Sequence, residues 1–242
     1  MTSGDRPAAV CLDYGRTLVD FARPEQDIAA VGVDLAGRLP LAGTAWIGRP
    51  GEFALALDQL TDELVAVAQR AHPFREADFK AVHREAMRQL LGAAVDVELS
   101  AAVGAALQRA WVAGMKVVEP ARTVLAGLRA RGLRLGLCSN APYPPTLMRE
   151  QLERLEVAQY FDATVFSSEI GWRKPDPRIF RELLSRLGLS AAEVWFVGDE
   201  WEADIEGAEA AGMRAILAPG VGQPGAGALQ LSSWGDLLSL VG

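Results

Sequence analysis

Short, nearly continuous apolar runs, each ended by a polar or small residue, mark the strands of this chain. Such runs are typical of strands that are buried on both faces of a parallel sheet. Between them lie segments with apolar residues at helical spacing, several of which end in a glycine. The alternation predicts βαβ units with right-handed crossovers. The predicted strands are 8–14, 133–139, 162–168, 193–199 and 213–219, and the predicted helices are 121–132, 146–156, 177–188 and 203–212.

The alternation stops between residues 21 and 113, where several helical patterns occur and no convincing strand. One part of this segment, 31–51, is rich in Gly and Pro and predicts irregular structure. The first strand is therefore separated from the others by a helical insert. We predict an α/β fold: a Rossmann-like, doubly wound parallel sheet core formed by residues 1–20 and 114–242, with 21–113 inserted as an α-helical cap.

Composition narrows the possible roles of the chain. Half of its 242 residues are hydrophobic, which allows a sizeable core without metals or disulfides. The formal net charge is −7 and no basic stripe exists, so nucleic acid is not an expected partner. Neither a signal peptide nor a membrane-spanning segment is visible, and Cys11 and Cys138 lie in apolar runs as reduced thiols would. We expect a cytoplasmic protein, either a monomer or a homodimer.

Polar residues gather where the predicted strands end. In an open parallel sheet, ligands bind beyond the carboxyl ends of the strands. Each residue there has an ordinary structural alternative, such as a helix cap, a turn or a surface lysine. Their convergence on one sheet edge favours a functional site instead. The residues that share this edge are Asp13, Ser139, Asn140, Lys174, Asp199 and Asp204.

This group of residues suits phosphoryl transfer. Three neighbouring carboxylates repel one another and need a cation, and Mg²⁺ prefers oxygen ligands. Lys174 would balance the remaining negative charge, and Ser139 with backbone N–H groups could donate to phosphate oxygens. A carboxylate that attacks phosphorus forms an aspartyl-phosphate. The sequence therefore predicts Mg²⁺ as cofactor and a small phosphorylated molecule as ligand.

Four motifs carry a resemblance to a known family. They are D-Y-G-R-T at 13–17, L-C-S-N at 137–140, K-P-D-P-R-I-F from Lys174, and V-G-D-E-W-E-A-D-I-E-G-A-E-A-A-G-M at 197–213. In this order they resemble the motifs of haloacid dehalogenase (HAD) superfamily hydrolases with a helical cap inserted after the first core strand. The resemblance covers the whole predicted core.

The resemblance implies a role for each matching residue. Asp13 would be the nucleophile and a Mg²⁺ ligand, while Lys174 would stabilise the nucleophile and the transferring group. Asp199 would bind the metal with the support of Asp204. Positioning of the site and the phosphate would fall to Thr17 and Ser139, and the expected substrate-binding residues are Ser139, Asn140, Arg16 and Phe21.

Gly15 departs from the family pattern. Family phosphatases carry an Asp at this position, which protonates the leaving group and then activates water. The backbone carbonyl of that residue is also a metal ligand, and a glycine keeps it, so Gly15 remains an expected metal ligand while the acid/base is missing. Glu200 and Glu169 are possible substitutes. Arg16 stands where a glycine is common and could add positive charge for the phosphate.

The sequence leaves several functions open. The leading hypothesis is a Mg²⁺-dependent phosphatase; the alternative is a catalytically impaired HAD-fold protein that binds a phosphorylated ligand or a protein partner. Family phosphonate hydrolases need a cap lysine that forms an imine, and the surroundings of Lys80, the only lysine in the insert, do not match theirs. Family dehalogenases need no metal, so the acidic pair of Asp199 and Asp204 argues against them.

Overall fold

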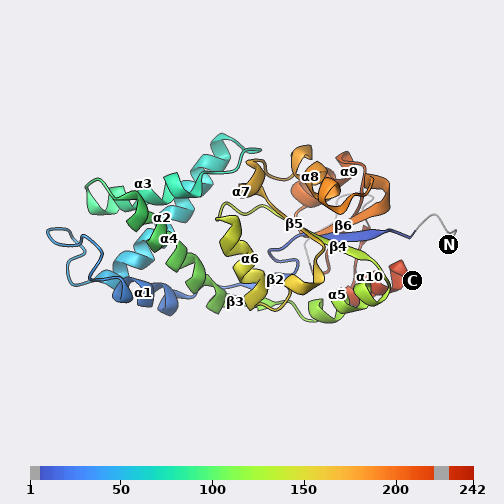
Figure 1. Ribbon diagram of the computed structural model, residues 1–242, viewed down its shortest axis with the longest axis horizontal. Coiled ribbons are helices and arrows are strands. Elements are labelled where there is room, and N and C mark those ends of the chain that lie inside the picture. Colours follow the sequence, from blue (N-terminus) through green and yellow to red (C-terminus); the bar gives the residue numbers. More distant parts are fainter. Residues whose placement is uncertain (1–5, 221–228) are drawn as a thin grey trace. The chain divides into compact units, whose positions relative to one another are not determined.

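The computed structural model of the protein describes residues 6–220 and 229–242 and divides the chain into two compact units (Figure 1). The core unit comprises Met1–Phe21, Lys116–Ala141 and Leu152–Gly242. The helical unit comprises Ala22–Met115 and Pro142–Gln151. The strand–helix alternation assigns 142–151 to the core, whereas this segment groups with the helical unit.

A six-stranded, fully parallel sheet forms the centre of the core unit, in the strand order β5-β4-β1-β6-β7-β8. Strand β1 lies between β4 and β6, so that Leu12 pairs with Leu137 on one side and Val197 on the other. The predicted doubly wound α/β fold is confirmed. The strands are β1 (Ala9–Leu12), β4 (Arg134–Ser139), β5 (Ala163–Phe166), β6 (Val194–Gly198), β7 (Arg214–Leu217) and β8 (Leu229–Gln230).

All five predicted strands are present, each shorter than its apolar run. The sequence did not reveal β8, because two residues are too few to show a pattern. It also missed a separate two-stranded sheet formed by β2 (Val19–Phe21) and β3 (Met115–Val117), whose strands are three residues long.

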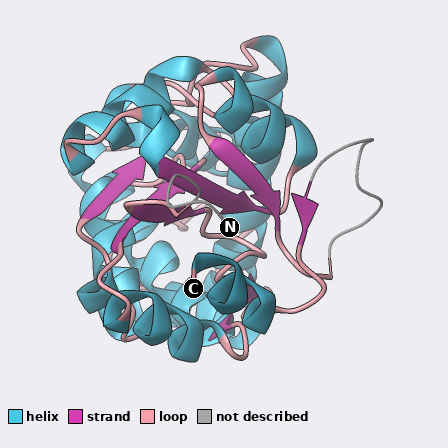
Figure 2. Cartoon of the chain, turned by 90° about the vertical axis from the view of Figure 1, so that its right-hand side faces the viewer, coloured by secondary structure: helices cyan, strands magenta, loops and turns pink. Residues whose placement is uncertain are grey.

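Helices cover both faces of this sheet (Figure 2). Helices α8 and α9 lie on one face, and α5 and α10 lie on the other (Figure 1). The helices along this part of the chain are α5 (Ala121–Ala130), α6 (Pro145–Arg154), α7 (Ser167–Ile170), α8 (Pro177–Leu187), α9 (Gly207–Ala210) and α10 (Trp234–Val241); a π-helical turn, Trp201–Glu206, precedes α9.

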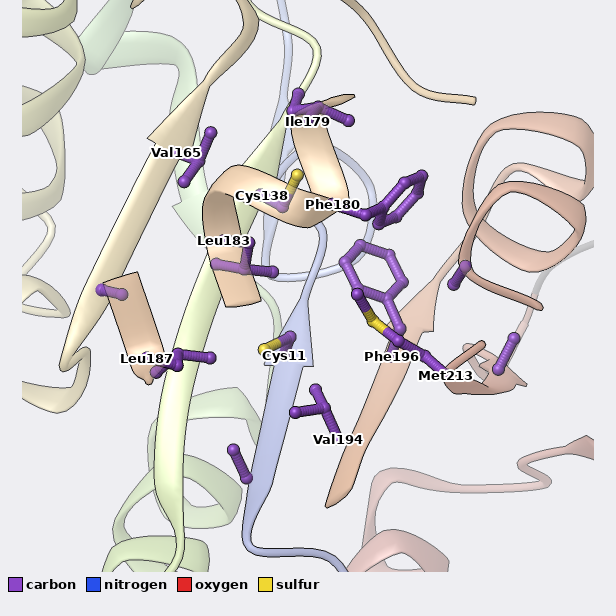
Figure 3. Close-up of a cluster of buried hydrophobic side chains, with 14 of the residues drawn as sticks. Cys11, Cys138, Val165, Ile179, Phe180, Leu183, Leu187, Val194, Phe196 and Met213 are labelled. Atoms are coloured by element: carbon purple, nitrogen blue, oxygen red, sulfur yellow. The ribbon is translucent and has the colours of Figure 1, made fainter. Parts of the chain in front are cut away.

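The packing of α8 on the sheet shows what holds the core together (Figure 3). Its apolar side chains Ile179, Phe180, Leu183 and Leu187 are fully buried against the strands. Each such side chain contributes about 1.5–3 kcal/mol relative to an exposed one. The thiols of Cys11 and Cys138 belong to the same cluster, and burial raises the pKa of both, to about 12 for Cys138. These cysteines are therefore core residues and poor nucleophiles.

Local sequence signals fix both ends of α8. Asp176 is the N-cap and accepts a hydrogen bond from the N–H of Arg178 at 2.9 Å, and Pro177 takes the first helical position. Gly188 ends the helix with φ of +61°, a conformation that costs glycine little. The glycine predicted at the end of this helix is confirmed, and the N-cap holds the loop with Lys174 immediately before the helix.

The helical unit contains α1 (Glu25–Asp34), α2 (Pro50–Ala71), α3 (Phe79–Leu91) and α4 (Val97–Ala110), which bury an apolar cluster around Phe53 and Met87. Asp78 and Asp96 cap α3 and α4, each accepting from a backbone N–H three residues on. Residues 35–49 form turns and irregular structure, so the prediction over 31–51 was wrong only at 31–34, where α1 ends, and at 50–51, where α2 begins. No helix within residues 6–220 or 229–242 is long and apolar enough to cross a membrane.

Candidate active site

Three neighbouring strands deliver polar residues to one edge of the sheet. Asp13 directly follows β1, Ser139 ends β4 and Asp199 directly follows β6. Because β4, β1 and β6 are adjacent and parallel, their carboxyl ends meet. The N–H of Asp13 continues the ladder by donating to the carbonyl of Val197 at 2.9 Å. The backbone pairing thus fixes the position from which the Asp13 carboxylate extends.

Lys174 is the centre of the cluster. Its Nζ donates to Oδ1 of Asp13 at 2.5 Å, to Oδ1 of Asp204 at 2.6 Å and to the carbonyl of Cys138 at 3.1 Å. The three donors of an ammonium group are all used. Only 2% of the lysine side chain is exposed, so these charge-assisted bonds lie in a poorly solvated environment, where they are strong.

Asp204 ties the other acidic residues to Lys174. Its Oδ2 accepts the backbone N–H groups of Asp199 and Glu200, both at 3.0 Å, while its Oδ1 accepts from the lysine. A Cβ at Gly198 would lie 2.3 Å from the Asp204 carboxylate, so only glycine permits this approach. Protein donors engage both oxygens of Asp204, which suits a residue that orients the loop after β6.

The three carboxylates form a donor set that fits a divalent cation. One oxygen from each of Asp13, Asp199 and Asp204 lies within 4.8 Å of the others. Three carboxylates against one ammonium leave an excess of negative charge, and oxygen ligands match the preference of Mg²⁺. Among the described residues, hydrogen bonds engage only Oδ1 of Asp13 and only Oδ1 of Asp199, the latter from Thr17 at 3.3 Å. Asp13 and Asp199 therefore each have a second carboxylate oxygen that could bind the cation.

Electrostatic crowding perturbs this cluster strongly. Burial raises the pKa of Asp13 to about 7, with the charge of Lys174 opposing the shift and Asp204 and Asp199 adding to it. The pKa of Asp199 rises to about 6 through burial and through the charges of Asp204 and Glu200. Burial alone would lower the pKa of Lys174, but the charges of Asp13 and Asp204 raise it. The lysine stays charged, and a cation beside the carboxylates would lower their pKa values.

The loop after Asp13 is a tight turn. The carbonyl of Tyr14 accepts the N–H groups of Leu18 and Val19, and the N–H of Arg16 donates to the carbonyl of Val19 at 2.8 Å. Arg16 has φ of +57°, which is unusual for a residue with a side chain. The arginine is exposed, and its charge opposes the increase in the pKa of Asp199.

An aromatic ring occupies the space beside Gly15. A Cβ at this position would lie 3.1 Å from Cε1 of Phe21, closer than such contacts normally are. The Phe21 side chain is 48% exposed, so its ring can move. Gly15 itself has no acidic side chain, and any side chain introduced at this position must displace the phenyl ring of Phe21.

The structure brings most of the predicted site residues into one hydrogen-bonded group, namely Asp13, Thr17, Lys174, Asp199 and Asp204. Ser139 is buried at the same sheet edge, and its hydroxyl makes no hydrogen bond to another described residue. Asn140 has a different environment from the one expected: its Nδ2 donates to the carbonyl of Lys174 at 3.1 Å and its Oδ1 accepts the N–H of Lys174 at 2.7 Å.

Asn140 thus holds the backbone of the lysine loop. Sequence reasoning missed this contact, because a backbone group leaves no signature in a sequence. The same applies to the carbonyl of Cys138, the third partner of Lys174. Of the possible substitute bases, Glu169 accepts from Arg186 at 3.1 Å, whereas Glu200 is exposed next to Asp199.

Comparisons with known proteins identify the family of the chain. The family model of haloacid dehalogenase-like hydrolases matches residues 9–212. A phosphoserine phosphatase from Thermus thermophilus is 37% identical over 171 residues, 70% of this chain and 64% of that relative. A glyceraldehyde 3-phosphate phosphatase from Methanothermobacter thermautotrophicus is 42% identical over 96 residues, 39% of this chain and 41% of the relative. The chain therefore spans less than two thirds of the length of these relatives.

Solved structures share the fold at lower identity. A 2-haloacid dehalogenase from Pseudomonas syringae has a TM-score of 0.68 at 23% identity, covering 96% of this chain and 97% of its own. A HAD phosphatase from Thermococcus onnurineus has a TM-score of 0.62 at 21% identity and covers 97% of both chains. The fold is thus shared by proteins with different named activities.

Proposed function

Because the chain belongs to the haloacid dehalogenase-like hydrolases, we propose that it is a Mg²⁺-dependent phosphatase of a small phosphorylated molecule. The observation that carries the proposal is the ion-paired cluster at the sheet edge, in which Lys174 donates to Asp13 and Asp204 beside Asp199. The named phosphatases among the relatives support the same chemistry. Phosphoric monoesters are therefore the first substrates to test.

The proposed reaction begins at Asp13. Its carboxylate attacks the phosphorus of the substrate, an O–P bond forms to the aspartate, and the bond to the leaving oxygen breaks. Water then attacks phosphorus and releases inorganic phosphate, which restores the carboxylate. Lys174 would hold Asp13 in place and provide positive charge for the phosphoryl group, and the hydroxyl of Ser139 would donate to a phosphate oxygen.

Mg²⁺ would be held by Asp13, Asp199 and the backbone carbonyl of Gly15, with Asp204 orienting the loop that carries Asp199. When bound, the ion would offset the negative charge that the carboxylates and the phosphate bring together. Thr17 fixes one oxygen of Asp199 through its hydroxyl. Arg16, exposed on the turn after Asp13, adds a permanent positive charge near Asp199.

Gly15 determines which substrates we expect to react. A positioned general acid is worth about 10²- to 10⁴-fold in rate. Without one, expulsion of a poor leaving group is slow, so aryl or acyl phosphates should react much faster than alkyl phosphates. Water attack on the aspartyl-phosphate also lacks its usual base, so the intermediate should accumulate and give a burst of the first product.

The primary test is turnover of an aryl phosphate with Mg²⁺ and after exhaustive chelation. We expect activity with the metal, at least a 100-fold loss without it, and loss of metal-dependent turnover in Asp199→Ala. Full activity after chelation would contradict the proposed role of the metal. A folded protein that turns over no phosphate ester, acyl phosphate or phosphoanhydride would favour the alternative function, a non-catalytic protein that binds a phosphorylated ligand or another protein.

A second test addresses the missing acid with a series of leaving groups and pre-steady-state kinetics. Gly15→Asp, with or without Phe21→Ala to clear the ring, should raise alkyl phosphate turnover and reduce the burst. Gly37→Asp is the matched control, because nothing lies within 4 Å of a Cβ at that glycine. If the wild-type enzyme hydrolyses alkyl and aryl phosphates equally without a burst, another residue supplies the proton, and Glu200→Gln then tests whether that residue is Glu200.

A further inference from the structure

The helical unit contains a cavity of about 230 Å³ between the first turns of α3 and α4. Most of its surface is apolar and comes from residues such as Phe79, Ala101 and Pro144, and the charged residues Asp78, Lys80 and Arg84 also line it. All the residues around it belong to the helical unit, so the cavity is a feature of that unit by itself. A cavity of roughly 150 Å³ lined by apolar side chains can hold benzene, so this one has room for a substituted single ring.

One wall of this cavity is His83, whose tautomer follows from its hydrogen bonds. The hydroxyl of Thr61 donates its only hydrogen to the carbonyl of Leu57 at 2.7 Å. Thr61 Oγ1 also lies 3.2 Å from Nδ1 of His83, and in that contact it can only accept. The hydrogen therefore lies on Nδ1, and Nε2 presents a lone pair.

Nε2 of His83 is a buried polar atom with no hydrogen-bond partner in the described chain. The side chain is only 2% exposed, and burial lowers its pKa to about 4, so the ring is neutral at pH 7. A buried acceptor left without a donor destabilises the folded chain. Such an atom at a cavity wall is a site where a ligand can supply the missing donor.

Gly104 lies directly against the edge of the histidine ring. A Cβ at this position would lie 3.0 Å from Cδ2 and 3.2 Å from Nε2 of His83. On the other side, the ring of Phe79 stacks on the imidazole with centroids 5.6 Å apart and an angle of 15° between the planes. The edge of the imidazole that carries the unpartnered nitrogen therefore packs against α4 at a glycine, and a methyl group there would press on it.

We propose that this cavity binds a small aromatic alcohol, whose ring packs against the apolar walls and whose hydroxyl donates a hydrogen bond to Nε2 of His83. Phenol is the simplest molecule with these features. A carboxylate offers no hydrogen to Nε2 at neutral pH, and a purely apolar ring leaves the nitrogen unpaired. The site lies outside the Asp13 cluster and does not depend on the chemistry proposed there.

The experiment follows the histidine nitrogens by NMR in the full-length, ¹⁵N-histidine-labelled protein during titration with phenol. The chain has two histidines, and exposed His72 is the internal control. We expect His83 in the Nδ1–H tautomer, a shift of its Nε2 resonance with phenol, and no shift at His72. Anisole has the ring but no hydroxyl hydrogen and should bind about threefold to tenfold more weakly, as expected for one hydrogen bond.

Two variants test the location. Gly104→Ala places a methyl group against Nε2 and should abolish the shift. Ala101 is exposed and lines the cavity, so Ala101→Leu narrows the cavity and tests the site even if Gly104→Ala does not fold. Ala93 lies outside the cavity, so Ala93→Leu is the control and should bind phenol as the wild type does. An Nε2–H tautomer, equal affinity for anisole, no shift of His83 at saturating phenol, or full binding to the Ala101→Leu variant would each overturn the proposal.

Discussion

The two units bury polar groups in different ways. In the core unit, Asp13, Lys174 and Asp204 lie at the carboxyl edge of a sheet, and every donor of the lysine has an acceptor. In the helical unit, His83 is equally buried, but one of its two nitrogens has no partner in the described chain. The first group is a nearly closed network of charges, whereas the second is a neutral group beside a cavity.

The difference comes from how each unit positions its residues. Backbone pairing fixes where parallel strands end, so residues that follow neighbouring strands meet even though they are far apart in the sequence. Helices bring polar residues together only where whole helix faces pack against one another. A charged network can therefore be maintained by a few sheet-edge positions, while a buried histidine depends on several side chains and on one glycine, Gly104.

The largest expected effect is on catalysis in the core unit. Asp13→Asn keeps the size of the side chain but replaces a carboxylate with a much poorer nucleophile, so aryl phosphate turnover should fall by about 10⁴-fold or more. Circular dichroism should remain unchanged. Asp20→Asn, at an exposed aspartate on β2, is the control and should retain full activity. A folded Asp13→Asn protein with a near-normal rate would make Asp13 a structural residue.

Removal of the lysine tests whether the network depends on its only buried cation. Lys174→Met leaves the carboxylates of Asp13 and Asp204 without their partner, and breaking a buried ion pair in this way costs about 3–5 kcal/mol. We expect this loss in the free energy of unfolding, measured with urea at pH 8 in chelator. Mg²⁺ should restore part of it. Lys116→Met, at an exposed lysine, should change stability by less than about 0.5 kcal/mol.

Titration of His83, in the helical unit, should instead change how the free energy of unfolding depends on pH. The pKa of His83 is lowered to about 4 from an ordinary value near 6.5, so between these values the unfolded chain holds a proton that the folded chain lacks. Stability should therefore fall as the pH falls through this window, by up to about 3 kcal/mol. His83→Gln should lose this part of the acid sensitivity.

The buried carboxylates with raised pKa values act in the opposite sense in part of the same range, so the measured quantity is the difference between His83→Gln and the wild type. Urea unfolding from pH 4 to 8 gives this difference directly. His72→Gln removes the exposed imidazole and should keep the wild-type profile. If His83→Gln also keeps it, the imidazole is not a buried neutral group.

The smallest expected effect concerns Asn140, the only asparagine in the chain. Asn140→Ala removes both hydrogen bonds to the backbone of Lys174 and should cost about 1–3 kcal/mol in the free energy of unfolding. It should lower kcat more than it raises KM, because Asn140 positions the lysine rather than the substrate. Asn140→Asp keeps the acceptor for the Lys174 N–H and should retain more activity. A rise in KM alone would show instead that Asn140 binds the substrate.

The sequence was informative where a pattern repeats and uninformative where contacts depend on packing. Continuous apolar runs predicted the five main strands, and apolar residues at helical spacing over 177–188 predicted α8. The polar residues after these strands could be grouped from topology alone. The two-residue strand β8 and the partners of Asn140 could not, because they involve too few residues or only backbone atoms. His83 carried no signal, since a histidine on a helix reads the same whether it faces solvent or a cavity.

The ring of Phe21 beside Gly15 also has an evolutionary consequence. A mutation that restores an acid at position 15 would meet this ring, so its benefit depends on the residue at position 21. The two positions are therefore expected to be epistatic, with the acid giving a larger benefit when a smaller residue stands at 21. For a lineage with this pair, the more accessible path is specialisation on substrates whose leaving groups need no proton.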